Sequence, residues 1–419
     1  MVRFLLFTAA VFSSWAQSTP SLPKPSGKYS VGKVSLHWID AERLEPATEA
    51  AHDKREIVVQ IWYPAAKPGR NTGSYLPGVE SLAASAAADS LSGLFGPSWR
   101  SILANEVRSN AHEEAPVASA GRLPLLVFSP GGGVPVVAYS IQLEDLASHG
   151  YVVVGVEPTH EAPGIVFPGG RVVTAANGYL SSLRRESGSV DAFEKKLADI
   201  SAADIRFVLD KLKSEDREKR SIFHNKFDLD QAGVFGHSRG GRVAARVCQT
   251  DSRIKACLNQ DGNMSWQPFW LDNAGRSMTQ PFLMLDHFDP DPPDEVFVKM
   301  GTTRAAYVAR RSARQAEARE KIFATIAGGS YHVKIKTPGV SHNSFADVRY
   351  LGRMDGAGIN AWPEDVRKAT PNLQILRTIS AWTRAFFDKS LRGDPAPLRR
   401  LMQADTNEVD VLTYGPPAR

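Results

Sequence analysis

Ser238 is the residue whose setting most clearly indicates chemistry. It stands in the stretch VFGHSRGGRV (residues 234–243), with Gly236 two positions before it and Gly240 two positions after it. A strand pattern precedes the serine and a helical pattern follows it. In that setting the G-x-S-x-G spacing is typical of a serine on a strained turn that pushes its hydroxyl out of the sheet. Glycines suit both flanking positions because the strand and the helix pack closely there. We therefore predict that Ser238 is a nucleophile and that Gly236 and Gly240 form its elbow.

A serine hydroxyl is a weak nucleophile, and it needs a base that is oriented by an acid. In a fold with this kind of elbow the chain order is serine, acid, histidine, which restricts the base to a histidine after Ser238. His332 falls inside the strand pattern YHVKIK, where a structural role is expected. His342 falls in the loop PGVSHNSFAD after the last long strand pattern. We predict His342 as the base, with His287 as the second candidate.

Two aspartates compete for the acid. Asp261 ends the strand pattern KACLNQD, directly after the helix that follows the serine, and Asp286 ends the next strand pattern, PFLMLD. Many enzymes with this chain order carry the acid after the later strand, so position alone slightly favours Asp286. Spacing does not decide between the two.

The glycine stretch in LLVFSPGGGVPV (residues 125–136) predicts an oxyanion hole, because a strand pattern runs directly into Gly131–Gly133. One amide donor is expected from Gly132 and the other from Arg239, the residue after the nucleophile. The same glycines could suggest a phosphate-binding loop, but the chain has neither G-x-G-x-x-G nor Gly-Lys-Ser/Thr at this place.

No metal or cofactor is expected. The sequence has no Cys/His cluster of the kind that binds zinc. The acidic segment DHFDPDPPDE (286–295) lacks the glycine and the spacing of a calcium loop, so we interpret it as a surface turn.

Strand and helical patterns alternate along the chain, which predicts a mostly parallel central sheet with helices on both faces. We assign residues 31–392 to this α/β domain. Two long excursions, about 66–121 and 288–330, interrupt the alternation and are expected to form lid-like insertions. Residues 393–419 are assigned to a C-terminal tail.

The N-terminus predicts export. Residues 1–16 combine Arg3, a short apolar run and a small-x-small cleavage pattern, as in a secretory signal peptide. Residues 17–30 are rich in Pro, Ser and Lys and read as an N-terminal arm. No later segment is apolar for long enough to span a membrane, so we expect a secreted or periplasmic protein.

Composition and charge narrow the partners. Of the 419 residues 42% are hydrophobic, and the formal net charge of +5 is too small to indicate a nucleic-acid partner. The basic segment 304–321 is expected to be a solvated helix face or a contact for anionic lipid headgroups. Cys248 and Cys257 could form a disulfide or stay as two buried thiols, and Asn263 starts a glycosylation sequon. The sequence does not predict an oligomeric state.

Four stretches in this order resemble the platelet-activating factor acetylhydrolase family, of the plasma and intracellular type II kind. They are FSPGGG (128–133), DLASHGYVVVGVEPTH (145–160), GHSRGG with LNQDGNM (236–264) and GVSHNSFAD (339–347). The resemblance implies an α/β-hydrolase fold. It also implies Ser238 as nucleophile, Asp261 as acid, His342 as base, and the amides of Gly132 and Arg239 as oxyanion donors.

The family resemblance also carries a substrate class. It implies a secreted serine esterase that removes short or oxidised sn-2 acyl groups from phospholipids. Three residues depart from the family pattern: Pro130 and Gly132 replace a His and a Leu, and Arg239 replaces an aromatic residue. The alternatives are a broad carboxylesterase or polyester hydrolase and, in another class, a non-catalytic lipid- or partner-binding module on a hydrolase scaffold.

Overall fold

The structure is a computed structural model of the chain. It describes residues 22–414 apart from 51, 70, 120, 263–277, 289–290, 292–293, 322, 324–325, 352–371 and 405–408. The predicted signal peptide (1–16), part of the predicted arm and the sequon at Asn263 lie outside the described residues. Over the part that is described, no helix is long and apolar enough to cross a membrane.

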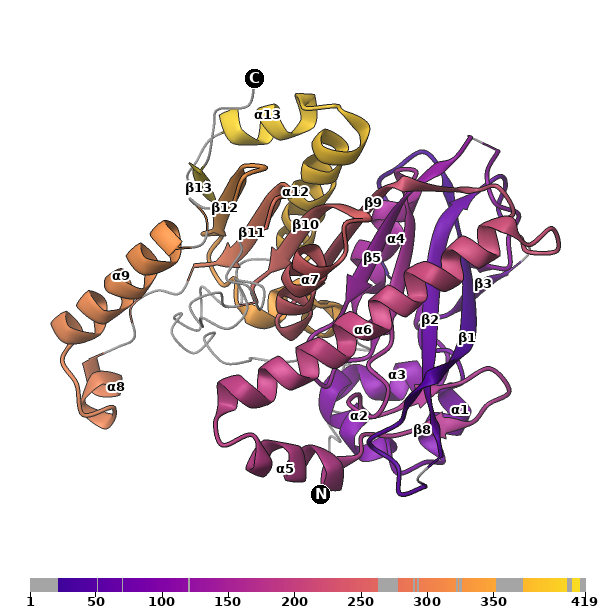
Figure 1. The fold of residues 1–419 in the computed structure, drawn as a ribbon, viewed down its shortest axis with the longest axis horizontal. Coiled ribbons are helices and arrows are strands. Elements are labelled where there is room, and N and C mark those ends of the chain that lie inside the picture. Colours follow the sequence, from indigo (N-terminus) through magenta and orange to yellow (C-terminus); the bar gives the residue numbers. More distant parts are fainter. Residues whose placement is uncertain are drawn as a thin grey trace, which may run out of the picture.

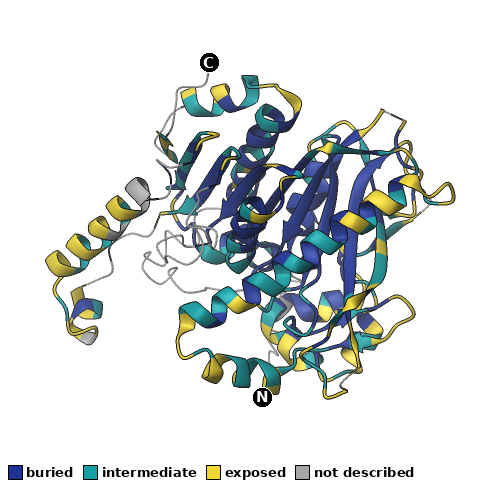
Figure 2. Ribbon diagram, in the orientation of Figure 1, coloured by how far each residue is buried: buried dark blue, intermediate teal, exposed yellow. Residues whose placement is uncertain are grey.

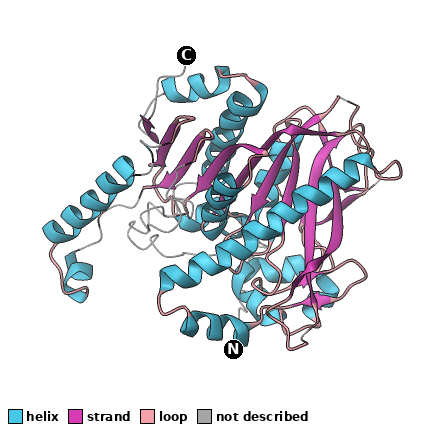
Figure 3. Cartoon of the chain, viewed as in Figure 1, coloured by secondary structure: helices cyan, strands magenta, loops and turns pink. Residues whose placement is uncertain are grey.

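A single 11-stranded sheet forms the centre of the molecule (Figures 1 and 3). Its middle is parallel, from β6 through β5, β9, β10 and β11 to β12. The two long N-terminal strands pair antiparallel with each other and join the sheet through β2 and β6. The predicted mostly parallel sheet is therefore confirmed. In spatial order the strands are β13 (Val409–Tyr414), β12 (Ser330–Ile335), β11 (Phe282–His287), β10 (Ile254–Gln260), β9 (Phe227–His237), β5 (Leu123–Ser129), β6 (Val152–Val156), β2 (Lys54–Ala65), β1 (Ser30–Leu44), β4 (Arg108–Glu113) and β3 (Thr72–Ser74).

Helices cover both faces of the sheet, which explains why the central strands are continuous apolar runs. On one face Leu125 and Val127 of β5 share a core with α6 (Val190–Arg217) and α7 (Arg239–Thr250). On the other face Leu126 and Phe128 share a core with α4 (Ser140–Ser148) and α12 (Asn372–Arg392). Figure 2 shows the resulting band of buried residues along the sheet.

The first predicted insertion contributes to the sheet as well as covering it. It contains β3, β4 and three short helices, and β4 pairs with the N-terminal part of β1. The helices are α1 (Val79–Ala83), α2 (Ala88–Phe95) and α3 (Trp99–Leu103). The second predicted insertion forms α8 (Asp294–Lys299) and α9 (Arg304–Lys321), which project away from the sheet (Figure 1).

The segment predicted as a C-terminal tail is partly structured. It contains α13 (Ala396–Gln403), and β13 pairs antiparallel with β12 at the edge of the sheet. A disulfide joins Cys248 of α7 to Cys257 of β10, with their Cα atoms 6.4 Å apart. It therefore links the helix that follows Ser238 to the strand that leads to Asp261.

Candidate active site

Ser238 occupies the sharp turn between β9 and α7. Its backbone has φ +55° and ψ −120°, a conformation that residues other than glycine rarely adopt. The amide of Ser238 donates to the carbonyl of Gln260 in the neighbouring strand (2.8 Å), which fixes the turn against β10. The strain is thus held by the sheet on one side and by the helix on the other.

The two flanking glycines are required by close contacts with the neighbouring strand. A Cβ atom on Gly240 would clash with the carbonyl of Ser129 and lie 2.5 Å from that of Pro130. A Cβ atom on Gly236 would lie 2.5 Å from the Ser129 carbonyl as well. The end of β5 therefore packs directly against the turn, and this contact brings the glycine loop at 131–133 beside Ser238.

His342 connects the serine to an aspartate. It begins a short 3-10 helix, η5 (His342–Phe345), which is capped by the side chain of Ser341. His342 Nε2 lies 3.0 Å from Ser238 Oγ, and His342 Nδ1 lies 2.5 Å from Asp261 Oδ2. These are the contacts that a serine, its base and its orienting acid require.

Asp261 is buried at the end of β10 and contacts a second histidine. Its backbone has a positive φ of +54°, and its amide donates to the carbonyl of Leu285 (2.8 Å). His287 Nδ1 lies 2.8 Å from both carboxylate oxygens, and the His287 amide donates to Oδ1 (3.2 Å). Burial alone would raise the pKa of Asp261, but His287, followed by His342, holds it well below its usual value.

The two competing candidates make other contacts than those predicted for them. Asp286 Oδ2 pairs with Nε2 of His332 at 2.7 Å, one strand further along the sheet. The acid that chain position alone slightly favoured therefore contacts a histidine other than His342. His287, the second candidate for the base, has its Nδ1 on Asp261. Sequence reasoning did not foresee this contact, because it depends on how far β11 extends past the end of β10.

The glycine loop has one amide that is already bonded inside the protein. Gly131 donates to the hydroxyl of Tyr139 (3.0 Å), and this hydroxyl also contacts His237 Nδ1 (2.9 Å). Among the described residues none accepts a hydrogen bond from the amide of Gly132 or of Arg239. These two amides, the predicted oxyanion donors, are therefore available to a ligand at this edge of the sheet.

His237 and Tyr139 support the loop from beneath. Both are buried, and burial lowers the pKa of His237 well below its usual value, so the ring is neutral. The His237 ring lies 4.6 Å from the ring of His342 and stacks on Phe345 at 5.4 Å. No pattern in the sequence pointed to Tyr139, which lies eight residues after Gly131, the loop glycine whose amide it accepts from.

One group in the described chain has metal-ligating atoms close together, and it coincides with this site. Atoms of His237, Asp261 and His342 lie within 4.8 Å of one another. However, the two ring nitrogens of His342 contact Ser238 and Asp261, and His237 Nδ1 contacts Tyr139. These contacts fit a hydrogen-bonded chain better than a metal-ligand set.

The side chain of Arg239 lies across the glycine loop. A Cβ atom on Gly132 would be 2.6 Å from its guanidinium carbon, so a larger residue at 132 is incompatible with this position. Arg239 pairs with Glu161 (2.6 Å) and with Glu194 (2.9 Å). Burial alone would raise the pKa of Glu194, but Arg239 holds it below its usual value. The charge that the sequence places near the site is therefore neutralised by two carboxylates.

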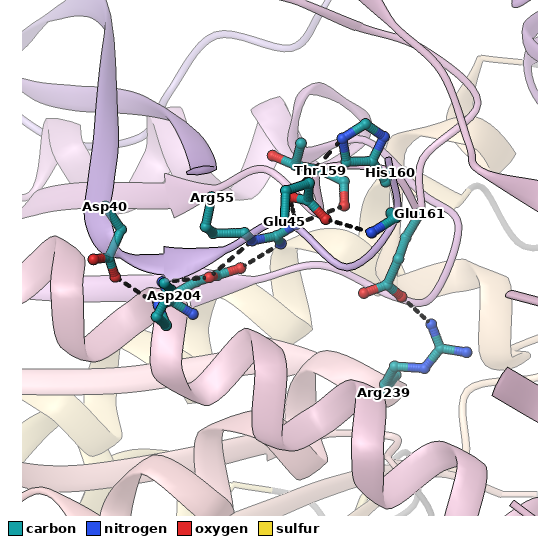
Figure 4. A network of polar contacts seen from close by, with 10 residues as sticks. Asp40, Glu45, Arg55, Thr159, His160, Glu161, Asp204 and Arg239 are labelled. Carbon is teal, nitrogen blue, oxygen red and sulfur yellow. Dashed lines mark hydrogen bonds and ion pairs between the residues drawn. The ribbon is translucent and has the colours of Figure 1, made fainter. Parts of the chain in front are cut away.

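A buried polar network centred on Arg55 lies beside Glu161 (Figure 4). Arg55 pairs with Glu45 (2.8 Å) and with Asp204 of α6 (2.6 Å). It also donates to the carbonyl of Thr159 (3.4 Å), two residues before Glu161. This bond ties the network to the segment that leads to Glu161, the partner of Arg239. Sequence patterns alone did not reveal Glu161 or Glu194.

Comparisons with known proteins agree with this geometry. A family model described as platelet-activating factor acetylhydrolase, isoform II, matches residues 15–165. A probable 1-alkyl-2-acetylglycerophosphocholine esterase of Arthroderma benhamiae is 23% identical over 98% of this chain and 100% of its own length. The platelet-activating factor acetylhydrolase of Canis lupus familiaris is 22% identical, over 58% of this chain and 55% of its own.

A solved structure extends the comparison over nearly the whole fold. A ferulic acid esterase from Streptomyces cinnamoneus superposes with a TM-score of 0.68 and 26% identity, over 94% of this chain and 100% of that chain. Together with the sheet and the comparisons above, this shows that the chain has the α/β-hydrolase fold and is a serine ester hydrolase. The predicted resemblance to the platelet-activating factor acetylhydrolase family is confirmed.

Proposed function

We propose that this protein hydrolyses carboxylic esters with a Ser238–His342–Asp261 triad through an acyl-enzyme. The observation that carries the proposal is the continuous chain of contacts from Ser238 Oγ through both ring nitrogens of His342 to Asp261. We assign Gly132 and Arg239 as the oxyanion donors, and Gly236 and Gly240 as the elbow glycines.

The reaction proceeds in two halves. Ser238 Oγ attacks the ester carbonyl carbon as His342 Nε2 takes its proton, and the new oxyanion accepts hydrogen bonds from the amides of Gly132 and Arg239. His342 then gives the proton to the leaving alcohol oxygen. Water attacks the acyl-enzyme and transfers a proton to His342, which returns it to Ser238 Oγ as the acid leaves.

His287 acts as a positioning residue in this proposal. By donating to Asp261 it keeps the carboxylate ionised and fixes its orientation toward His342. It acts through Asp261: its Nδ1 lies 2.8 Å from both carboxylate oxygens, and one of these, Oδ2, also contacts Nδ1 of His342.

The proposed substrate is a phospholipid with a short or oxidised sn-2 acyl group. The names of the fungal and mammalian relatives support this class. A broad carboxylesterase is the second candidate, and the ferulic acid esterase supports it because that likeness extends over 94% of this chain. A non-catalytic binding module is disfavoured because a fold without catalysis has no need for a strained serine beside an imidazole.

We further propose export and contact with lipid surfaces. Residues 1–16 would be removed as a signal peptide, and the disulfide of Cys248 and Cys257 suits an oxidising compartment. In the insertion at about 288–330, Val298 and Met300 are 79% and 53% exposed beside the basic helix α9. Exposed apolar residues next to cationic ones favour an anionic membrane surface. The insertion at about 66–121 would form a wall of the substrate site.

The test is a comparison of substrates on wild type and Ser238→Ala. Hydrolysis is measured with p-nitrophenyl esters from acetate to palmitate, with a 2-acetyl phosphatidylcholine and with methyl ferulate. Activity on the acetyl phospholipid that exceeds activity on methyl ferulate and disappears in Ser238→Ala supports the proposal. Preference for methyl ferulate moves the second candidate forward. Folded wild type that turns over none of these esters contradicts both.

A further inference from the structure

The side chain of Arg239 has no part in the proposed reaction, yet it lies against the oxyanion hole. A Cβ atom on Gly132 would be 2.6 Å from both the guanidinium carbon and Nη1 of Arg239. The backbone of Gly132 does not have the positive φ that favours glycine, unlike that of Gly133 (φ +70°). The guanidinium is therefore what excludes a side chain at position 132. One residue thus supplies a proposed oxyanion amide from its backbone and covers the other donor residue with its side chain.

Three hydrogen bonds fix the plane of this guanidinium. Nε and Nη2 donate to the two carboxylate oxygens of Glu194 (2.9 and 3.0 Å), and Nη1 donates to Glu161 Oε2 (2.6 Å; Figure 4). The side chains of Glu161 and Glu194 are only 8% and 13% exposed. Pairing through two parallel bonds sets the direction of the guanidinium as well as balancing its charge, and a lysine ammonium could not reproduce it. We call Arg239 with these two carboxylates the Arg239 clamp.

The glycine loop is the part of the oxyanion hole that needs support. The Gly131 amide donates to Tyr139, and further along the chain the Val136 amide donates to the buried carboxylate of Glu157 (3.0 Å). Gly132 lies between these two anchors, and among the described residues none accepts a hydrogen bond from its amide. Consecutive glycines restrict the backbone little, whereas an oxyanion donor must lie within about 3 Å of the developing charge. The guanidinium of the Arg239 clamp packs on this position of the loop.

We propose that Glu161 and Glu194 are positioning residues for the oxyanion hole. By holding the guanidinium of Arg239 across Gly132, they keep the amides of these two residues at the separation that one oxyanion requires. The clamp joins three separate segments, because Glu161 follows β6, Glu194 lies near the start of α6 and Arg239 begins α7. Each carboxylate acts through Arg239. The inference rests on the proposed function, because it needs an oxyanion to form at this place.

The experiment compares Arg239→Met with Arg246→Met. Methionine at position 239 keeps the backbone amide and an unbranched side chain but removes all three donors of the clamp. Arg246 is the matched control, because it lies on the same helix and also pairs with a carboxylate of α6, that of Asp199 (2.8 Å). Each protein is assayed with p-nitrophenyl acetate and with a trifluoromethyl ketone as inhibitor. Ser238 Oγ adds to the ketone carbon, its proton passes to His342, and the carbonyl oxygen becomes an oxyanion in the hole.

We expect Arg239→Met to lower kcat about 10- to 100-fold, because outright removal of an oxyanion donor costs about 10²- to 10³-fold and here the donors are displaced rather than lost. The inhibition constant of the ketone should rise by a similar factor, while KM changes less than about threefold, because the hole acts mainly on the oxyanion and not on the ground-state ester. Arg246→Met should keep all three constants within about threefold of the wild type. A purely structural role of the ion pairs between α6 and α7 would instead affect both variants alike.

A second variant decides the matter if Arg239→Met fails to fold. Glu161→Gln combined with Glu194→Gln keeps the shape of the clamp and removes its negative charges, and we expect kcat to fall and the inhibition constant to rise about three- to tenfold. Unchanged kcat and inhibition constant in either folded variant, an equal loss in Arg246→Met, or a loss confined to KM overturns the proposal. Failure of the proposed function would look different and would remove the inference with it: hydrolysis by the wild type would be absent or would survive Ser238→Ala.

Discussion

Replacing Asp261 by asparagine is the perturbation that separates the two candidate acids. The substitution keeps the shape of the side chain and removes its charge. In the wild type this carboxylate receives Nδ1 of His342 at 2.5 Å and Nδ1 of His287 at 2.8 Å. An amide in the same place can turn only one oxygen toward these two donors and presents an NH₂ group to the other.

The expected loss is large. In serine hydrolases with a Ser-His-Asp triad, Asp→Asn lowers kcat about 10⁴-fold because the imidazole is then held in the wrong tautomer. This corresponds to roughly 5 kcal/mol at 1.36 kcal/mol for each factor of ten. The burial of Asp261 and its contact with two imidazoles place this site in the same regime, so we expect kcat to fall by about 10³ to 10⁴.

The matched control is Asp286→Asn. It removes a carboxylate from the end of the next strand, but the contact that it breaks is the one with His332. We expect kcat to change less than about threefold, as for a substitution that does not touch the reacting groups. The assay is steady-state hydrolysis of p-nitrophenyl acetate, with folding of each variant checked by circular dichroism. A larger loss in Asp286→Asn than in Asp261→Asn would refute the assignment of the acid.

Three further predictions concern His287, Gly240 and Glu157. His287→Ala should lower kcat about tenfold and move the acid limb of the kcat/KM–pH profile to higher pH, because the Asp261 carboxylate loses a hydrogen-bond donor. His287→Gln, whose amide can donate, should restore part of both effects. Equal pH profiles for the wild type and the two variants would contradict the positioning role. Gly240→Ala should abolish soluble expression or activity, because the new Cβ atom clashes with the carbonyl of Ser129. Gly93→Ala in α2, whose Cβ atom meets no neighbour within 4 Å, should instead raise the free energy of unfolding by up to about 1 kcal/mol in a denaturant titration. Equal stability of the two variants would exclude the close contact at Gly240. Burial raises the pKa of Glu157 from 4.5 to about 7, so the contribution of its protonated carboxyl to stability is complete below pH 4.5 and is lost as the pH rises through 7. Between pH 4 and pH 8 the free energy of unfolding of the wild type should fall by about 3 kcal/mol relative to that of Glu157→Gln. A constant difference between the two proteins in guanidinium titrations would show that this carboxyl is not buried as described.

The parts of the site that lie close together in the sequence could be predicted from it. Ser238, Gly236 and Gly240 occupy one turn, and the clash that makes Gly240 obligatory comes from the next strand in the sheet. Position alone could not select the acid, because Asp261 and Asp286 both end parallel strands at the same edge. The family resemblance favoured Asp261, and the geometry places that carboxylate on His342.

The rest depends on contacts between distant segments, for which local patterns carry no signal. His287 reaches Asp261 because β10 and β11 are parallel neighbours and β11 continues to His287, past the last pair of their ladder, Gln260 with Leu285. Arg239 could be recognised as a charge near the site, but its neutralisation by Glu161 and Glu194 depends on a loop and a helix from elsewhere in the chain. The edge strand β13 was missed because it is short, partly exposed and far from the other strands in sequence.

Covalent labelling of Ser238 tests the central claim most directly. The wild type and Ser238→Ala would be treated with a fluorophosphonate and digested, and the modified peptide would be identified by mass spectrometry. We expect one adduct per chain, on Ser238, and no adduct in Ser238→Ala. Labelling of a different residue, or undiminished labelling of folded Ser238→Ala, would contradict it.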